Sequence, residues 1–151
     1  MKWLIAGIIG LGLLLPPVAD ARKIRKIRWA ENTWKVRHTY GPSNPGRNIF
    51  ADGKRSAFVD RKRRLVLRIH KGRAVEVVGP AKDYGTFSWS VDSNLNNVDR
   101  WRVVGLFVWV PNGNEQDIEF ARWGASRSPA GWIVSWARHR RVGFTNFAVT
   151  S

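Results

Sequence analysis

Three carboxylates alternate along the stretch NEQDIEFARWG, residues 114 to 124: Glu115, Asp117 and Glu119. They are three of only 11 acidic residues in a chain that holds 26 lysines and arginines. On a β-strand they would lie on one face, where like charges repel and push carboxyl pKa values apart. Glycoside hydrolysis uses such a set, because one carboxylate stays ionised near the anomeric carbon while another holds a proton for the leaving oxygen.

The spacing leaves open which two carboxylates would form the reacting pair. Glu115 and Glu119 are four residues apart, so their Cα atoms lie about 13 Å apart in an extended strand. A retaining glycosidase needs carboxyl groups about 5–5.5 Å apart. Side chains that lean towards each other on a twisted sheet close much of this gap, and Glu115 with Asp117 is equally allowed. The simpler interpretation is a solvated edge strand whose charges deter aggregation.

The segment before the carboxylates is predicted to pair with them. Ile118 and Phe120, with Gln116, would occupy the opposite face of the acidic strand. The run from Val103 to Val110 would form a hairpin with it across the turn at residues 111 to 114. This run is apolar on both faces, which is typical of a strand packed between two layers.

The rest of the chain also has the pattern of short strands. Further strands are predicted at residues 64–69, 74–78, 86–91, 132–136 and 143–149. Clusters of Gly, Pro, Asn and Asp separate the runs, as at residues 41–46. No long segment has helical periodicity. We therefore predict an all-β fold, an antiparallel β-sandwich.

The first 21 residues are predicted to be a cleaved secretory signal. Lys2 precedes an apolar run from Leu4 to Leu15, and Ala19-Asp20-Ala21 matches the small-x-small cleavage pattern. The run is shorter than the roughly 20 apolar residues that span a bilayer. We expect an exported chain, periplasmic or extracellular, that folds as one domain over residues 22 to 151. The basic residues directly after the cut oppose export and are expected to slow it.

The charge and the residue types limit the partners and cofactors. A net charge of +15 attracts anionic polymers, and basic runs lie at residues 61–64 and 138–141. The chain has no cysteine, and its three histidines, His38, His70 and His139, lack the spacing of metal ligands. We expect no metal or other cofactor and no specific nucleic-acid partner; the sequence does not indicate an oligomeric state.

The hexapeptide from Glu115 to Phe120, EQDIEF, resembles the catalytic motif of glycoside hydrolase family 16, which is usually written E-[aliphatic]-D-[aliphatic]-E-F. Its flanks agree with this family. Tyr84-Gly85-Thr86-Phe87, Gly105-Leu106-Phe107-Val108-Trp109 and Arg122-Trp123-Gly124 are similar to segments on either side of the family motif, the last as in a bacterial branch. The resemblance covers roughly residues 29 to 136.

The resemblance implies a jelly-roll sandwich of the concanavalin A type with the acidic strand in a concave cleft. It implies a retaining endo-β-glucanase or a related transglycosylase that acts on a polysaccharide. Glu115 would be the nucleophile, Asp117 the assisting carboxylate and Glu119 the general acid/base. Glu76 is similar to a sugar-contacting glutamate on a neighbouring strand of the family.

The sequence departs from the family pattern in two places. Gln116 stands where the family has an aliphatic residue, and since it should face away from the cleft we expect it to affect packing and not chemistry. Family members continue for several strands after the motif, whereas this sequence stops at Ser151. We therefore expect an incomplete, C-terminally shortened sandwich with exposed strand edges.

The tryptophans are candidates for substrate contact, because flat aromatic faces stack on sugar rings and on bases. Trp109 and Trp123 would share the face of the carboxylates and are the predicted substrate platforms. We place Trp29, Trp34 and Trp89 in the core.

Three functions stay open from the sequence. The first is a glycosidase that cleaves internal β-glycosidic bonds with retention. The second is an inactive relative that binds glycan or an anionic cell-surface polymer through tryptophan and arginine. The third is a cationic nucleic-acid binder, for which affinity would fall steeply with salt.

Overall fold

The computed structural model describes residues 23–81, 85–110, 113–126, 130–138 and 140–148. Within these ranges the regular elements are nine strands and a single 3₁₀ turn, η1 (Leu95–Asn97). Every pair of neighbouring strands runs antiparallel. The prediction of an all-β antiparallel fold is confirmed, and the sheets are compatible with a β-sandwich.

The chain divides into two compact units, with the boundary between residues 84 and 85. In the first unit, β1 (Lys26–Trp29), β2 (Asn32–Val36) and β5 (Val77–Val78) form a sheet in the order β1-β2-β5. A separate hairpin joins β3 (Ala57–Val59) to β4 (Leu65–Leu67). Two of the predicted strands are therefore much shorter than the sequence pattern suggested, because only part of each apolar run finds a neighbouring strand.

The turn between β1 and β2 contains two residues, Ala30 and Glu31, both with positive φ, 46° and 63°. Positive φ at both central residues is the geometry of a type I′ hairpin turn, whose twist matches that of the flanking strands. Neither residue is glycine, so the left-handed conformation costs about 1 kcal/mol at each. The cross-strand pairing of β1 with β2 has to offset that cost.

The core of the first unit lies on one face of this sheet. Its buried members are Ile27, Val36 and Ala57. Partly buried apolar side chains pack around them: Trp29, Leu65, Val75 and Val77. The rings of Trp29 and Trp34 lie with centroids 5.5 Å apart and planes tilted by 55°. Both side chains are partly buried, and Trp29 packs against the core.

Arg25 ties β1 to the segment before β3. Its guanidinium donates hydrogen bonds to the backbone carbonyl oxygens of Asp52, at 2.8 Å, and of Ala57, at 2.7 Å. A basic residue directly after the predicted cleavage site therefore has a structural role. Its guanidinium therefore satisfies backbone acceptors in and before β3.

We expect Val36→Ala to lower the free energy of unfolding of the first unit by about 2 kcal/mol, because it empties a fully packed position. Val36 is 1% exposed. The matched control is Val59→Ala, which removes the same two methyl groups from a side chain that is 37% exposed. Urea unfolding followed by circular dichroism measures both. Equal losses in the two variants would mean that Val36 is not a core residue.

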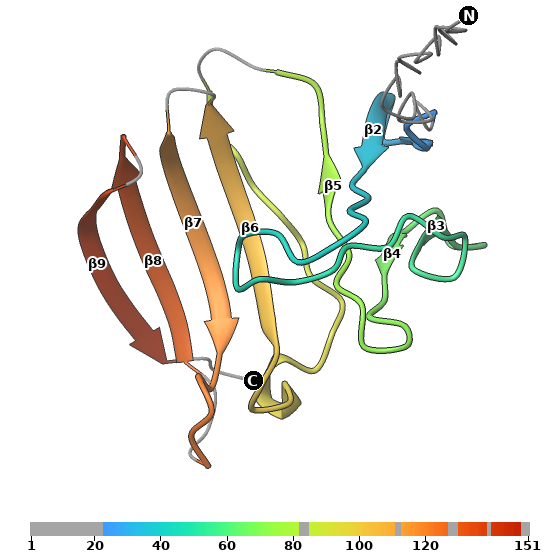
Figure 1. The fold of residues 1–151 in the computed structure, drawn as a ribbon. Helices are drawn as coiled ribbons and strands as arrows, with labels where there is room; N and C mark the ends of the chain where they lie inside the picture. Colours follow the sequence, from blue (N-terminus) through green and yellow to red (C-terminus); the bar gives the residue numbers. More distant parts are fainter. Residues whose placement is uncertain (1–22, 82–84, 111–112, 127–129, 139, 149–151) are drawn as a thin grey trace, which may run out of the picture. The chain divides into compact units, whose positions relative to one another are not determined.

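The second unit is one four-stranded sheet in the order β6-β7-β8-β9, drawn side by side from yellow to red in Figure 1. Its strands are β6 (Val103–Val110), β7 (Asn114–Ala121), β8 (Ala130–Ala137) and β9 (Arg140–Ala148). β6 and β7 pair along their whole length, from Val103 opposite Ala121 to Val110 opposite Asn114. The predicted hairpin and the two predicted downstream strands are confirmed.

Two predictions about the second unit are wrong. Residues 86–91 form no strand, and Phe87, Trp89 and Val91 are exposed. Trp89 is therefore not a core residue. Alternation of apolar and polar residues is a local property, whereas a strand also needs a neighbouring backbone to pair with its N–H and C=O groups.

The second incorrect prediction is that β6 is covered on both faces. A strand packed between two layers would be buried on both faces, but Val103, Trp109 and Val110 are all exposed. A continuous apolar run shows which side chains can be buried and does not show whether another layer covers them.

No helix among the described residues is long and apolar enough to cross a membrane. The predicted signal segment, residues 1–21, lies outside the described residues.

Candidate functional site

β7 carries the three alternating carboxylates on one face of the four-stranded sheet. Residues directly opposite each other in antiparallel strands share a face. Glu115 pairs with Trp109 on β6, and Glu119 pairs with Trp132 on β8. The common face predicted for the carboxylates, and the place of Trp109 on that face, are confirmed by this register.

Asp117, the middle carboxylate, is the most buried of the three. Its side chain is 8% exposed, and it lies between Phe107 on β6 and Val134 on β8. Apolar neighbours on both sides reduce the access of water to this position. A buried carboxylate is costly unless its environment holds it, so its presence marks this part of the sheet as more than a solvated edge.

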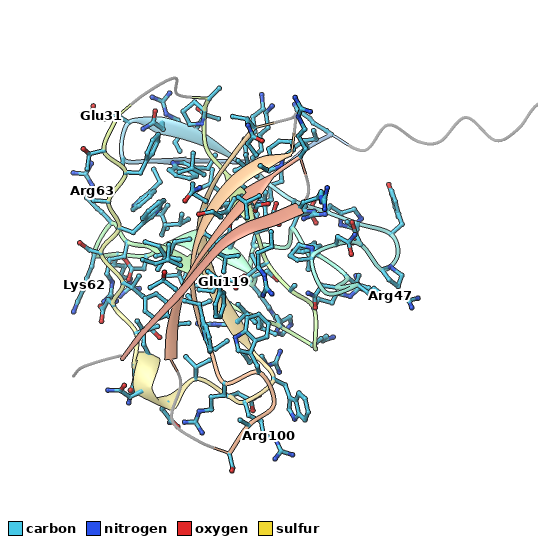
Figure 2. All side chains as sticks on the ribbon, turned by 90° about the vertical axis from the view of Figure 1, so that its left-hand side faces the viewer. Glu31, Arg47, Lys62, Arg63, Arg100 and Glu119 are labelled. Atoms are coloured by element: carbon cyan, nitrogen blue, oxygen red, sulfur yellow. The ribbon has the colours of Figure 1, made fainter. Side chains whose placement is uncertain are left out.

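Glu119 has a raised pKa. The main cause is desolvation by burial, and the negative charge of Asp117 raises it further. Both effects favour the protonated carboxyl. Opposite Glu119 on β6 is Gly105, and a side chain built there would meet nothing within 4 Å. The position opposite Glu119 on β6 therefore carries no side chain, and the space above Gly105 is open. Glu119 is labelled in Figure 2.

Glu119 opens onto a hollow of about 350 Å³ on the same sheet face. Its lining comes from β7, β8, β9 and the segment after β7: Glu119, Trp123, Trp132, Val134, Arg141 and Phe144. Three of these six side chains are aromatic. A hollow lined by aromatic faces with a few polar groups is the usual form of a site for a small molecule or a sugar unit.

Two aromatic rings form one wall of the hollow. The ring centroids of Trp132 and Phe144 are 4.9 Å apart, with the planes tilted by 30°. The guanidinium of Arg141 lies 5.2 Å from the centre of the Phe144 ring. The indole N–H of Trp132 is buried and has no hydrogen-bond acceptor among the described residues.

Arg141 reaches this face through an irregularity in β9. Ser135 pairs with Gly143, but Trp136 pairs with Arg141, so Val142 is an extra residue between the two pairs. A β-bulge of this kind changes which face of the sheet the side chains beyond it occupy. Without it, Val142 and not Arg141 would stand on the carboxylate face.

Sequence reasoning missed the roles of Trp132, Phe144 and Arg141. The downstream strands themselves were predicted, but their register was not, and the bulge leaves no sequence signal that we can identify. The alternation of Trp132 with Val134 could have assigned them to one face. Nothing in the chain could have assigned that face to the carboxylates.

Trp123 lies two residues beyond the end of β7, with φ of 49° and 55% of its surface exposed. The strand phase that the sequence assumed does not extend to it. Trp123 nevertheless lines the hollow with Glu119. Trp109 is 48% exposed and stands beside Glu115. Both predicted platform residues are therefore accessible, one at each end of the carboxylate row.

The segment after β7 is held against the one before β6. The N–H of Gly124 donates a 2.7 Å hydrogen bond to the carbonyl of Arg100, and a guanidinium N–H of Arg122 donates a 3.0 Å bond to the carbonyl of Asn96. Gly124 has φ of 80°, and a Cβ built on it would lie 2.7 Å from the Trp101 ring. The backbone conformation and the ring together require glycine here.

We expect Gly124→Ala to destabilise the second unit by roughly 1–2 kcal/mol, from the left-handed conformation and from the clash with Trp101. A double-mutant cycle with Trp101→Ala separates the causes. If the ring contact matters, Gly124→Ala costs less once the ring is removed, as urea unfolding would show. An unchanged cost in the Trp101→Ala background would assign the whole effect to the backbone.

Glu76 lies in the first unit and not among the residues of this hollow. Its carboxylate accepts a 2.7 Å ion-paired hydrogen bond from the guanidinium of Arg37. Gln116, on the opposite face of β7, is exposed and accepts a 3.0 Å hydrogen bond from the hydroxyl of Ser135. The orientation predicted for Gln116 is confirmed.

The described residues hold no group of three or more His, Cys, Asp or Glu side chains that could bind a metal ion. His139 lies outside them. The hollow itself contains one carboxyl, Glu119, whose pKa is raised. Asp117 is buried next in the row and Glu115 lies at its far end, and neither lines the hollow.

The chain matches no model of a known protein family, no curated protein and no solved structure.

Proposed function

We propose that this protein cleaves internal β-glycosidic bonds of a polysaccharide with retention of configuration, as the glycoside hydrolase family 16 motif implies. The proposal depends above all on one observation. Glu119 has a raised pKa and opens onto an aromatic hollow, on the same sheet face as Glu115. A glycosidase needs a carboxyl that holds its proton for the leaving oxygen, with a second carboxylate on the same face.

In this mechanism Glu115 attacks the anomeric carbon, and the leaving oxygen takes the proton of Glu119. The C–O bond to the leaving sugar breaks as the bond to Glu115 forms. Glu119, now ionised, then takes a proton from water or from the hydroxyl of another glycan, and that oxygen displaces Glu115. Asp117 raises the pKa of Glu119 before the first step.

The aromatic side chains fit the binding of a polysaccharide. Trp123, Trp132 and Phe144 line the hollow beside Glu119, and Trp109 stands beside Glu115. Sugar rings stack on such faces at several positions along a chain. A polysaccharide lies outside most cells, so the proposal agrees with export by the predicted signal segment.

The carboxyl separation makes the stereochemistry a direct test. The Cα atoms of Glu115 and Glu119 are about 13 Å apart, and the side chains must lean together to reach the retaining separation of about 5–5.5 Å. Proton NMR of the first products from a soluble β-glucan shows the anomeric configuration. We expect the β-anomer first. An initial α-anomer would overturn the retaining mechanism, because a wider carboxyl separation leads to inversion.

Non-catalytic glycan binding is the second candidate, and the exposure of Trp109 and Trp123 supports it. Incubation with the same β-glucan distinguishes the two candidates. A non-catalytic binder gives saturable binding of the glucan and releases no new reducing ends. Affinity that barely changes with salt would exclude a nucleic-acid type of binding in either case.

A further inference from the structure

The first unit contains a second hollow, of about 440 Å³, beside β2. None of its lining residues belongs to the carboxylate row or to the mechanism of the proposed cleavage. Its charged and aromatic lining consists of Lys23, Lys35, Arg37, His38, Tyr40, Asp52 and Glu76. Basic side chains outnumber acidic ones in this lining.

The cations of this hollow fall into two groups. Arg37 is ion-paired with Glu76 at 2.7 Å, and His38 Nδ1 lies 3.4 Å from an oxygen of Asp52. Lys23 and Lys35 make no ion pair with any residue that the structure describes. The two acidic side chains are thus already engaged, and the two lysine charges have no acidic partner among the residues that the structure describes.

Lys35 faces a second lysine across the sheet, and neither forms an ion pair with a described residue. It pairs directly with Lys26 on β1, and both side chains are exposed. Like charges at directly opposed positions destabilise a sheet. Arg28 occupies the same face of β1, two residues further along. An anion bound at this end of the sheet would offset repulsion that the fold otherwise has to bear.

We propose that this hollow binds an acid group of an anionic polysaccharide, with Lys23 and Lys35 holding the carboxylate or sulfate. Tyr40, 79% exposed at the hollow, offers a ring face on which the adjoining sugar stacks. The site would anchor the chain to an acidic glycan without cleaving it. It is independent of the proposed glycosidase function, since none of its residues lies on β7.

The composition of the hollow favours a glycan over a nucleic acid. A nucleic acid has a phosphate at every nucleotide and needs aromatic faces for successive bases. This hollow has one tyrosine ring, and two carboxylates stand among its cations. They would repel a densely charged backbone. A polysaccharide with spaced acid groups meets the lysines without that repulsion.

The test uses the full chain and titration calorimetry with an oligogalacturonate, a neutral β-glucan oligosaccharide of equal length and a single-stranded oligonucleotide. The variant is Lys23→Gln with Lys35→Gln. The matched control is Lys54→Gln with Lys71→Gln, which removes the same charge from exposed positions of the first unit outside the hollow. Lys35→Arg keeps the charge and checks that the effect is electrostatic.

We expect the hollow variant to weaken oligogalacturonate binding by about 10-fold and the control by less than about 2-fold at low salt. Lys35→Arg should bind within about 2-fold of the natural chain. Equal losses in the two double variants would overturn the site and leave only diffuse charge attraction. Tighter binding of the oligonucleotide, with the same dependence on Lys23 and Lys35, would also overturn the glycan site. A natural chain that does not bind oligogalacturonate would overturn it as well. Cleavage of β-glucan is measured separately, so neither proposal can be mistaken for the other.

Discussion

Replacement of Glu115 by glutamine is expected to reduce the cleavage of β-glucan by roughly 10³- to 10⁶-fold, because an amide cannot attack the anomeric carbon. Binding should persist, since glutamine has nearly the same shape and Trp109 still stands beside it. Release of reducing ends measures cleavage, and calorimetry with the same glucan measures binding. The combination of lost cleavage and kept binding separates a catalytic role from a structural one.

The matched control is Glu31→Gln, the same chemical change in the turn between β1 and β2, labelled in Figure 2. It should leave both cleavage and binding unchanged. The circular dichroism and melting curve of each variant show whether the chain still folds. Cleavage that survives Glu115→Gln unchanged would contradict the assignment of the nucleophile.

Glu119→Gln is expected to lower cleavage of β-glucan by about 10²- to 10⁴-fold, because the leaving oxygen no longer receives a proton. An aryl β-glucoside with an acidic phenol as leaving group should lose much less in its first step, since that group departs without a proton. Stopped-flow release of the phenol measures this step. Equal losses for glucan and for the aryl glucoside would contradict the role of Glu119 as the acid.

The pH dependence of kcat/KM is a second test of the role of Glu119. The pKa of Glu119 is raised, so the alkaline limb of kcat/KM should lie above the ordinary value of 4.5. Asp117→Asn removes the second cause of the shift and leaves the first, desolvation, in place. We expect the alkaline limb to move to lower pH in Asp117→Asn without reaching the ordinary value. An unchanged limb would show that another group controls it.

The same shift affects stability, and its sign can be stated. Because the folded state binds the Glu119 proton more tightly, the stabilisation from this group is fully present below pH 4.5. It is lost as the pH rises through the folded pKa. The free energy of unfolding of the natural chain should therefore fall as the pH rises from 4.5 through the folded pKa of Glu119, and Glu119→Gln should remove this fall. Melting curves of the natural chain and of the variant across this pH range measure the difference.

The row of carboxylates and its hairpin could be predicted from the sequence because both depend on local rules. Side chains alternate along any strand, so Glu115, Asp117 and Glu119 share a face wherever that strand is placed. An apolar run and an alternating strand joined by a short polar turn pair as a hairpin with little dependence on the rest of the chain. Both expectations agree with the structure.

The incorrect predictions concern properties that depend on contacts between distant segments and not on local rules. Residues 86–91 alternate as well as any strand in the chain, but they have no strand partner in the described structure. β6 has the composition of a covered strand, but none of its residues is buried. Pairing and coverage are relations between distant segments, and the composition of one segment contains no information about the other.

The amino-acid sequence by itself determined the all-β class, the acidic face of β7 and its pairing with β6, because these follow from the period of two along the chain. Only the tertiary structure decided that Glu119 meets Trp132, Phe144 and Arg141 in one hollow. These residues come from strands whose register depends on pairing between segments, and in β9 on a single extra residue. The burial that raises the pKa of Glu119 has the same origin, since desolvation depends on every atom packed around a carboxyl and not on its neighbours in sequence.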